Sequence, residues 1–446
     1  MKDILQELED KRKKKNEEEI SEDERKVATF YSAAMNEEEI EKVGIKPMKP
    51  VLDLCVEIAS KQQESGDPKE YAKLLGTLAY KYGICPFFAI GVSPDNENTN
   101  MSITQIYQGG LGLPDRDYYF DDDKEEKRIE YKKCIAIFLT LLSNPEATKE
   151  EGGVIEPTDE MIEMASKVYE LELKLAEKHM TKTENRDPHA TYNKMSMEQF
   201  MERCGGGTFD FEAYLTSATG KTKEELGDIN VRNVDALQRV AEIASTIDDD
   251  NNDATLLAYL NWMSIKSCAP YLSQVFVNEH FKFYEKCLMG TAEIKPRWKR
   301  AMAFTESALG ECLGKLYCSK YFDETSKDRA LDIVERVRQA LEDRLKEVDW
   351  MKADTTRTQA LQKMNSFGVK IGYPDKWIDY TPLKIDEEKD DFLSMVFKSR
   401  QFDNDRDNNE MNAPTDKSKW VRFACSLACY FVVYLMFNEK KPSSTT

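Results

Sequence analysis

The chain has 446 residues, of which 41% are hydrophobic and 33% are charged, and its formal net charge is −19. The hydrophobic share is too high for a disordered chain, and 20 glycines are too few for an all-β protein. The negative charge argues against a nucleic-acid-binding surface, because such a surface needs an excess of lysine and arginine.

The amino-terminal residues 1–26 are rich in charge and predict a helical segment. The beginning of this segment lacks the apolar run of a secretory signal, which favours a cytoplasmic or a truncated protein. Ser21 and Glu24 have the spacing of a capping box, which predicts a helix start. Pro68 and Gly83 predict the first position and the end of a later helix.

The helical pattern is interrupted at residues 87–107, where the runs FFAIGV and MSITQIY are joined by a polar turn. Both runs are rich in residues that favour strands, so this segment predicts a small β-hairpin. The run VKI at 369–371 predicts one further short strand.

Helical periodicity dominates the rest of the chain and predicts a mainly α fold with one large multi-helix body. Ser196 and Gln199 have capping-box spacing, and long helices are predicted over 298–321 and 326–348. Two helices are predicted to carry an apolar face, and the first of these faces is predicted to lie in the core. The first consists of Met161, Met164, Val168, Leu171 and Leu175, and the second of Ala330, Ile333, Val334, Val337, Ala340, Leu341 and Leu345.

No set of residues has the pattern of a catalytic or metal site. The three histidines are His179, His189 and His280, and none is followed by Glu at the next place and His at the fourth. The helical zinc-peptidase motif is therefore absent, and a surface or capping role is favoured for each histidine, since a zinc site needs at least three protein ligands. We assign no catalytic residue, no metal ligand and no cofactor to this chain, and its substrate-binding residues are unknown.

Other chemical signals are weak. The 82 aspartates and glutamates form pairs at helical spacing by chance, and the three glycines at 205–207 lack the Lys-Ser/Thr of a phosphate-binding loop. We interpret these glycines as a turn. The ten cysteines contain no C-x-x-C pair, which predicts reduced and mostly buried thiols.

Several segments resemble the neprilysin and endothelin-converting-enzyme family of zinc endopeptidases. The most specific is PFFAIGVSPDNENTNMSITQIYQGGLGLPDRDYY, which begins at Pro86 and ends at Tyr119. The later segments ATYNKM, VDWM and VKIGYPDKW agree with the family in order and spacing. The resemblance covers residues 27–420 and includes Trp420 itself.

The resemblance implies that these residues build mainly a helical cover lobe over a central cavity. In the family, a catalytic lobe follows with two zinc histidines, a glutamate base and a glutamate ligand, and it acts on peptides. None of these residues has a counterpart here, so zinc belongs to the full-length family and the chain by itself is predicted to be inactive. Ala34 and Ala301 stand where animal members carry two cysteines that pair, so this chain lacks that disulfide.

The carboxy-terminal residues 421–446 do not resemble the family, and their apolar stretch 423–437 has 15 residues without a charge. This stretch is shorter than the roughly twenty residues of a typical membrane-spanning helix, although Lys440 and Lys441 would flank it. Three readings remain: a tail anchor in a membrane, an element buried against the helical body, or an alternative or erroneous continuation of the reading frame. The third is favoured.

Two functional hypotheses follow. The first is that the chain is the amino-terminal part of a neprilysin-like zinc endopeptidase, with the missing catalytic lobe as its partner. The second is a non-catalytic helical module that binds a peptide or protein partner through exposed apolar surface, with or without a tail anchor.

Overall fold

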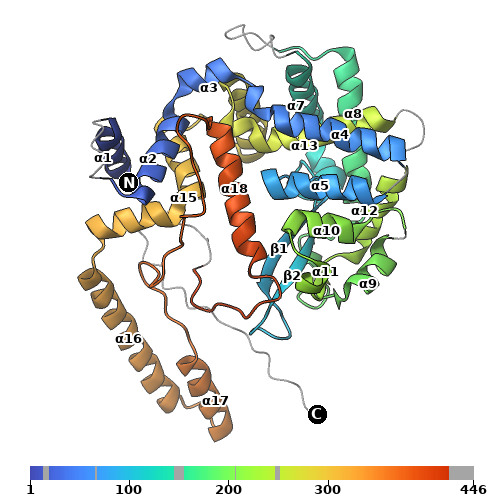
Figure 1. Cartoon of the computed structure of the whole chain (residues 1–446). Helices are drawn as coiled ribbons and strands as arrows, with labels where there is room; N and C mark the ends of the chain where they lie inside the picture. Colours follow the sequence, from blue (N-terminus) through green and yellow to red (C-terminus); the bar gives the residue numbers. More distant parts are fainter. Residues whose placement is uncertain (14–19, 66–67, 145–154, 206, 247–251, 421–446) are drawn as a thin grey trace. The chain divides into compact units, whose positions relative to one another are not determined.

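The computed structural model describes residues 1–13, 20–65, 68–144, 155–205, 207–246 and 252–420 (Figure 1). The chain divides into two compact units. Among the described residues, the first consists of 1–31, 298–381 and 417–420, and the second of 32–297 and 382–416. Helices dominate both units, which confirms the predicted mainly α fold.

The first unit is built from helices of two separate chain segments, residues 1–31 and 298–381. Ile4, Leu5 and Leu8 are buried on one side of its first helix, which explains why so charged a segment folds onto the rest of the unit. Its helices are α1 (Lys2–Lys13), most of α2 (Glu22–Met35), α15 (Arg297–Tyr321), α16 (Glu324–Glu347) and α17 (Asp354–Asn365).

The second unit holds most of the buried aromatic side chains and the sheet. Helices α5 (Pro68–Tyr82), α10 (Phe211–Thr219) and α18 (Phe392–Asn408) pack against one another. So do α7 (Glu125–Ser143), α8 (Asp159–Ala176) and α13 (Asn252–Cys268). Its helices are α3 (Glu37–Val43), α4 (Lys49–Ser65), α5 (Pro68–Tyr82), α6 (Asp117–Phe120), α7 (Glu125–Ser143), α8 (Asp159–Ala176), α9 (Met197–Phe200), α10 (Phe211–Thr219), α11 (Lys223–Leu226), α12 (Val234–Thr246), α13 (Asn252–Cys268), α14 (Gln274–His280) and α18 (Phe392–Asn408).

The sheet confirms the predicted hairpin and extends it. Strands β1 (Phe88–Pro94) and β2 (Ser102–Gln108) pair antiparallel, with Phe88 opposite Gln108. Two short strands that the sequence pattern did not predict complete the order β1-β2-β4-β3: β4 (Ile229–Val231) runs parallel to β2, and β3 (Lys194–Met195) runs antiparallel to β4. The hairpin is therefore one edge of a four-stranded sheet.

Local signals placed the helix boundaries well. Ser21 and Glu24 form the predicted capping box, with each backbone N–H bonded to the other residue's side chain. The capping box at Ser196 and Gln199 is also present. Helix α5 begins at the predicted Pro68, and Gly83 follows it with φ of 65°, a conformation in which glycine carries no Cβ penalty.

The predicted strand at 369–371 is wrong. The segment carries no strand structure, and Val369 and Ile371 instead pack against Ala330 and Val334 of α16. Their β-branched side chains fit this apolar contact, but no neighbouring strand is available to pair with their backbone.

The predicted helix α16 is confirmed, and its predicted apolar face is only partly buried. Ala330 and Val334 are buried, whereas Ile333, Val337 and Leu341 are exposed. By contrast Val168, Leu171 and Leu175 of α8 are buried, as predicted.

The predictions on a membrane span, on the cysteines and on the segment boundaries concern the described residues only in part. No helix in the described ranges is both long and apolar enough to cross a membrane. The cysteines described form no disulfide with one another, and five of them are buried. The apolar stretch 423–437 lies outside the described residues, and the predicted boundaries at residues 26 and 420 stay predictions.

Candidate functional site

The three histidines do not come together as a metal site. Burial lowers the pKa of His179 to about 4, and burial also lowers the pKa of His280 to about 4. The His280 ring stacks on Tyr284 at 4.7 Å between centroids, while His189 is exposed. In the part of the chain that the structure describes, no three His, Cys, Asp or Glu side chains are placed to hold a metal ion.

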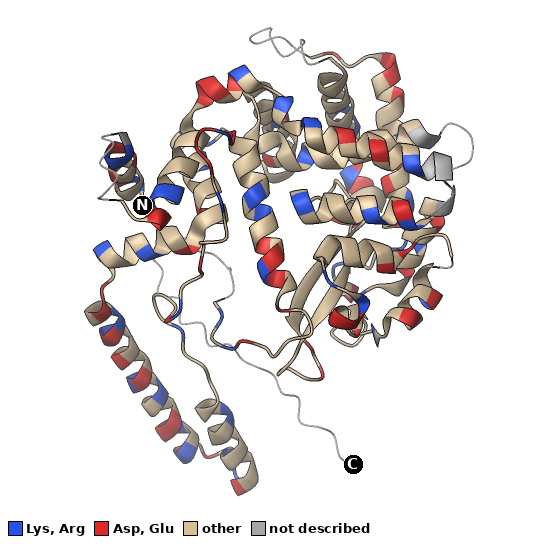
Figure 2. Cartoon of the chain, viewed as in Figure 1, with Lys and Arg blue, Asp and Glu red and all other residues tan. Residues whose placement is uncertain are grey.

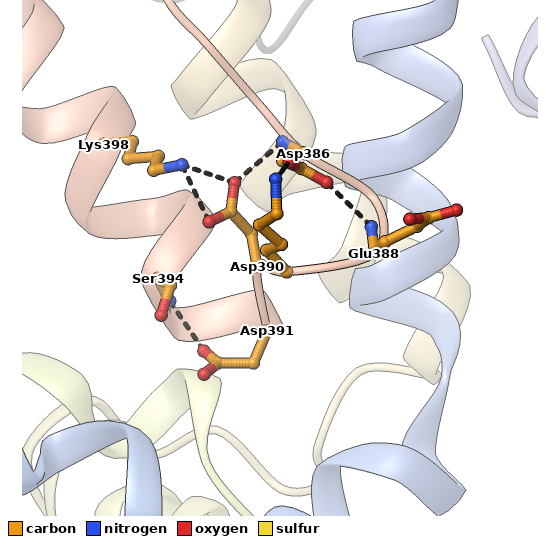
Figure 3. Close-up of polar contacts among 7 residues, drawn as sticks. Asp386, Glu388, Asp390, Asp391, Ser394 and Lys398 are labelled. Carbon is orange, nitrogen blue, oxygen red and sulfur yellow. Dashed lines mark hydrogen bonds and ion pairs between the residues drawn. The ribbon is translucent and has the colours of Figure 1, made fainter.

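An acidic segment, residues 386–391, lies before α18 (Figure 3). Asp391 accepts a hydrogen bond from the backbone N–H of Ser394 at 2.8 Å and so caps α18. Asp390 accepts from Lys398 Nζ at 2.6 Å and from the backbone N–H of Asp386 at 2.8 Å. These carboxylates are used in starting the helix and in an ion pair, which explains the segment without a ligand.

A buried polar group surrounds Glu172 of α8, whose side chain is fully buried. Tyr119 of α6 donates to Glu172 Oε2 at 2.7 Å, and Tyr131 of α7 donates to the same carboxylate at 2.7 Å. Trp262 of α13 donates from Nε1 to Glu172 Oε1 at 3.1 Å. We name these four residues the Glu172 centre.

The Glu172 centre is fixed to the segment that follows the hairpin. The Tyr119 hydroxyl also accepts from the backbone N–H of Leu113 at 3.3 Å, and Tyr284 donates to the carbonyl of Gly112 at 3.0 Å. A Cβ atom on Gly112 would lie 1.7 Å from the Tyr131 hydroxyl oxygen, so only glycine fits there. The Leu113-Pro114 turn that follows the hairpin is thereby held against α6, α7 and the π-helix Phe281–Cys287.

Burial and hydrogen bonding have opposite effects on the pKa of Glu172. Burial raises the pKa of Glu172, and hydrogen bonds from Tyr131 and Tyr119 together with the charge of Lys266 oppose this rise. Burial lowers the pKa of Lys266, and the charge of Glu172 opposes that effect. Because the Glu172 side chain is fully buried among Tyr119, Tyr131 and Trp262, it is not accessible to a substrate as a general base.

The sequence patterns did not predict this centre, although they contained a signal for it. Glu172 lies four residues after Val168 and three before Leu175, so it occupies the predicted apolar face of its helix. A charged residue at a core position needs hydrogen-bonding partners, and this requirement pointed to buried tyrosine or tryptophan side chains elsewhere in the chain.

Comparison with known proteins identifies the family. Residues 1–374 match the model for the amino-terminal part of Peptidase family M13. The chain belongs to this family. The predicted resemblance to neprilysin and endothelin-converting enzymes is therefore confirmed.

Two curated relatives give the extent of the M13 match. The chain is 26% identical to Membrane metallo-endopeptidase-like 1 of Mus musculus over 88% of this chain and 51% of the relative. It is 27% identical to Endothelin-converting enzyme 1 of Bos taurus over 84% of this chain and 47% of the relative. The chain thus spans about half the length of these relatives.

Solved M13 structures share the fold. The zinc metalloprotease Zmp1 of Mycobacterium tuberculosis in its open state matches with a TM-score of 0.79 and 27% identity, over 94% of this chain and 60% of Zmp1. PepO of Lactobacillus rhamnosis matches with a TM-score of 0.75 over 94% of this chain and 62% of PepO, and its 15% identity shows the fold alone.

Proposed function

We propose that this chain is the part of an M13 zinc endopeptidase that encloses short peptide substrates, and that it hydrolyses no peptide by itself. The single observation that carries the proposal is the match to the amino-terminal M13 model over residues 1–374. The relatives named above, Membrane metallo-endopeptidase-like 1 and Endothelin-converting enzyme 1, are about twice as long as the matched part. We include in the proposal for this chain the relatives' activity, their peptide substrates and a zinc-binding lobe as partner.

Zinc does not fit the residues that the structure describes. The sequence lacks the two histidines four residues apart that a helical zinc-peptidase site uses. His179 and His280 are largely desolvated inside the second unit, and no group of three suitable ligands occurs among the described residues. A zinc ion of the enzyme would therefore need ligands outside these residues.

In this proposal the residues of the chain hold the wall around the substrate in place. The Glu172 centre holds the segment after the hairpin against α7, α8 and α13 through hydrogen bonds of 2.7 to 3.1 Å. A rigid framework of this kind suits a wall that limits the size of a substrate, because its shape does not depend on mobile side chains.

The proposal is tested by two experiments. First, the purified chain is assayed for zinc by metal analysis and for cleavage of a quenched-fluorescence peptide, with full-length Zmp1 as the positive control. We expect far less than one zinc per chain and no chelator-sensitive cleavage, whereas one zinc per chain or such cleavage would contradict the proposal.

Second, the transcript is sequenced beyond the codon for Trp420. An in-frame segment encoding a helix with two histidines four residues apart would support an M13 endopeptidase. A locus without any such segment would refute the enzyme part of the proposal.

A further inference from the structure

The hairpin strand β1 forms one edge of the four-stranded sheet. The strand order is β1-β2-β4-β3, so β1 pairs with β2 on one side and with no described strand on the other (Figure 1). A strand at the edge of a sheet leaves the backbone groups of every second residue without a strand partner. The register of the hairpin determines which residues these are.

A backbone hydrogen bond fixes the direction in which each residue of β1 points. Asp95 donates from its backbone N–H to the carbonyl of Met101 at 2.9 Å, and these two residues continue the register of β1 and β2. In an antiparallel pair, residues that exchange hydrogen bonds alternate with residues that point away from the partner strand. Counting back from Asp95 in steps of two, Ser93 and Gly91 point toward β2. The residues that point away from β2, which we name the β1 edge, are Ile90, Val92 and Pro94.

Two further observations agree with this assignment. The residues of β2 that are opposite the β1 edge also point away from their partner strand. Ser102 donates to the carbonyl of Ala413 at 2.8 Å, and the carbonyl of Ile106 accepts from the backbone N–H of Arg232 at 3.0 Å. Pro94 has no N–H, and proline is tolerated in a sheet where its nitrogen faces away from the ladder on an edge strand.

The β1 edge is open within the described residues. Its three residues are exposed or partly exposed, whereas Phe88 at the start of the strand is buried. Gly91 is also partly exposed, although a Cβ atom on it would lie 3.1 Å from the Tyr107 ring, so the backbone itself reaches the solvent. Helix α18 contacts β1, but no described group of this helix or of another element forms a hydrogen bond with the β1 edge.

The β1 edge carries no charge. Neither strand of the hairpin contains a charged residue (Figure 2). In the turn between them, the buried Asp95 forms an ion pair with Lys194 at 3.0 Å. Because the edge offers backbone donors and acceptors alone, it suits the backbone of an extended chain rather than a charged side chain or an ion.

We propose that the β1 edge binds a short peptide in extended form as an additional strand of the sheet, and that this peptide is a substrate of the M13 enzyme. The inference rests on the proposed function, and it names the surface that the substrate contacts. In an antiparallel arrangement, the peptide residues opposite Ile90 and Val92 each exchange two hydrogen bonds with β1. Recognition through the backbone leaves the peptide's side chains largely free, so many sequences fit.

The length of the β1 edge favours a peptide over a second copy of the chain. From Ile90 to Pro94 there are four residue steps, which span about 14 Å at the rise of a strand. Strand pairing between two copies over this length uses about five residues of each, whereas a stable protein interface uses roughly 20–30 residues on each side. A short peptide needs no contact beyond the strand itself.

The test compares V92P with V92A in the full chain. V92P removes the outward N–H and places a ring where a peptide carbonyl would bind, while proline remains compatible with an outward position of an edge strand. V92A shortens the same side chain and keeps the N–H. The probe is a fluorescein-labelled heptapeptide of alternating threonine and valine between two lysines, and its binding is measured by fluorescence anisotropy. Circular dichroism verifies that both variants fold.

We expect V92P to weaken binding of the probe at least about ten-fold relative to V92A, because it loses a hydrogen bond and its ring meets the peptide backbone. Hydrogen exchange on the unmodified chain gives a second readout that does not depend on how a variant folds. The probe should slow the exchange of the Ile90 and Val92 amides, which have no partner in the free chain. It should leave Gly91 and Ser93 unchanged, because their amides already bond to β2.

Equal affinity of V92P and V92A for the probe would overturn the proposal. So would a probe that does not bind the unmodified chain, or one that leaves exchange at Ile90 and Val92 unchanged. A free chain that is dimeric and already protects both amides would overturn it in favour of a second copy. These results leave the proposed function standing, because zinc content, peptide cleavage and the transcript test that function separately.

Discussion

Replacing Glu172 by alanine tests the importance of the buried centre. The variant E172A removes the acceptor of two tyrosine hydroxyls at 2.7 Å and one indole N–H at 3.1 Å. A buried donor left without an acceptor costs roughly 1–3 kcal/mol. Trp262 can still donate to the Tyr131 hydroxyl, which lies 3.0 Å away, so at least two donors lose their partner. We expect a loss of about 2–5 kcal/mol in the free energy of unfolding.

The assay is urea unfolding at pH 7 followed by far-ultraviolet circular dichroism. The matched control is E170A, because Glu170 lies two residues away on α8 and is exposed. Surface substitutions of this kind change the free energy of unfolding by at most about 0.5 kcal/mol. An E172A variant that unfolds at the same urea concentration as E170A, with the same slope, would refute the reasoning that the centre stabilises the fold.

Two further predictions concern the same unit. Burial lowers the pKa of His179 to about 4 from an ordinary value of 6.5, so the unfolded chain binds its proton first as the solution is acidified. The His179 contribution to stability is present above pH 6.5 and is lost as the pH falls toward 4, by at most about 3 kcal/mol. Urea unfolding at several pH values should therefore show a smaller loss of unfolding free energy on acidification for H179Q than for the unmodified chain. The same dependence of unfolding free energy on pH in both proteins would contradict this prediction. The variant G112A places its Cβ atom against the Tyr131 hydroxyl and should lower the melting temperature by several degrees. The control G310A should not lower it, because a Cβ atom at that position meets no atom within 4 Å. Equal effects of the two variants on the melting temperature would argue against the tight packing at Gly112.

Local patterns explain what the sequence predicted correctly. The hairpin follows from two strand-forming runs around a polar turn, and the capping boxes at Ser21 and Ser196 need only residues three positions apart. The apolar side of α8 follows from helical periodicity within one segment. Each of these features is determined by neighbours in the chain.

The features that were missed or wrong depend on distant residues. Strand β4 has three residues, and its pairing with β2 joins segments about 125 positions apart. Glu172 is tolerated in the core only because Tyr119, Tyr131 and Trp262 meet there from three other helices. The segment 369–371 has strand-forming side chains but no strand to pair with. No pattern within a single segment contains this information.

In the candidate site, too, local features could be predicted from the sequence and features that depend on distant residues could not. The absence of a helical zinc-peptidase motif could be read directly from the three histidines, because that motif is local. The desolvation of His179 and His280 could not, because it arises from side chains that pack on them in the folded chain. The predicted absence of catalytic residues in this chain stays a prediction.

The most direct test of the central claim is a metal and activity measurement on the purified 446-residue chain. Zinc per chain is determined after incubation with zinc and removal of the excess, and cleavage of a quenched peptide is followed with and without a chelator. The account predicts no stoichiometric zinc and no chelator-sensitive cleavage. One tightly bound zinc per chain, together with cleavage that the chelator abolishes, would contradict it.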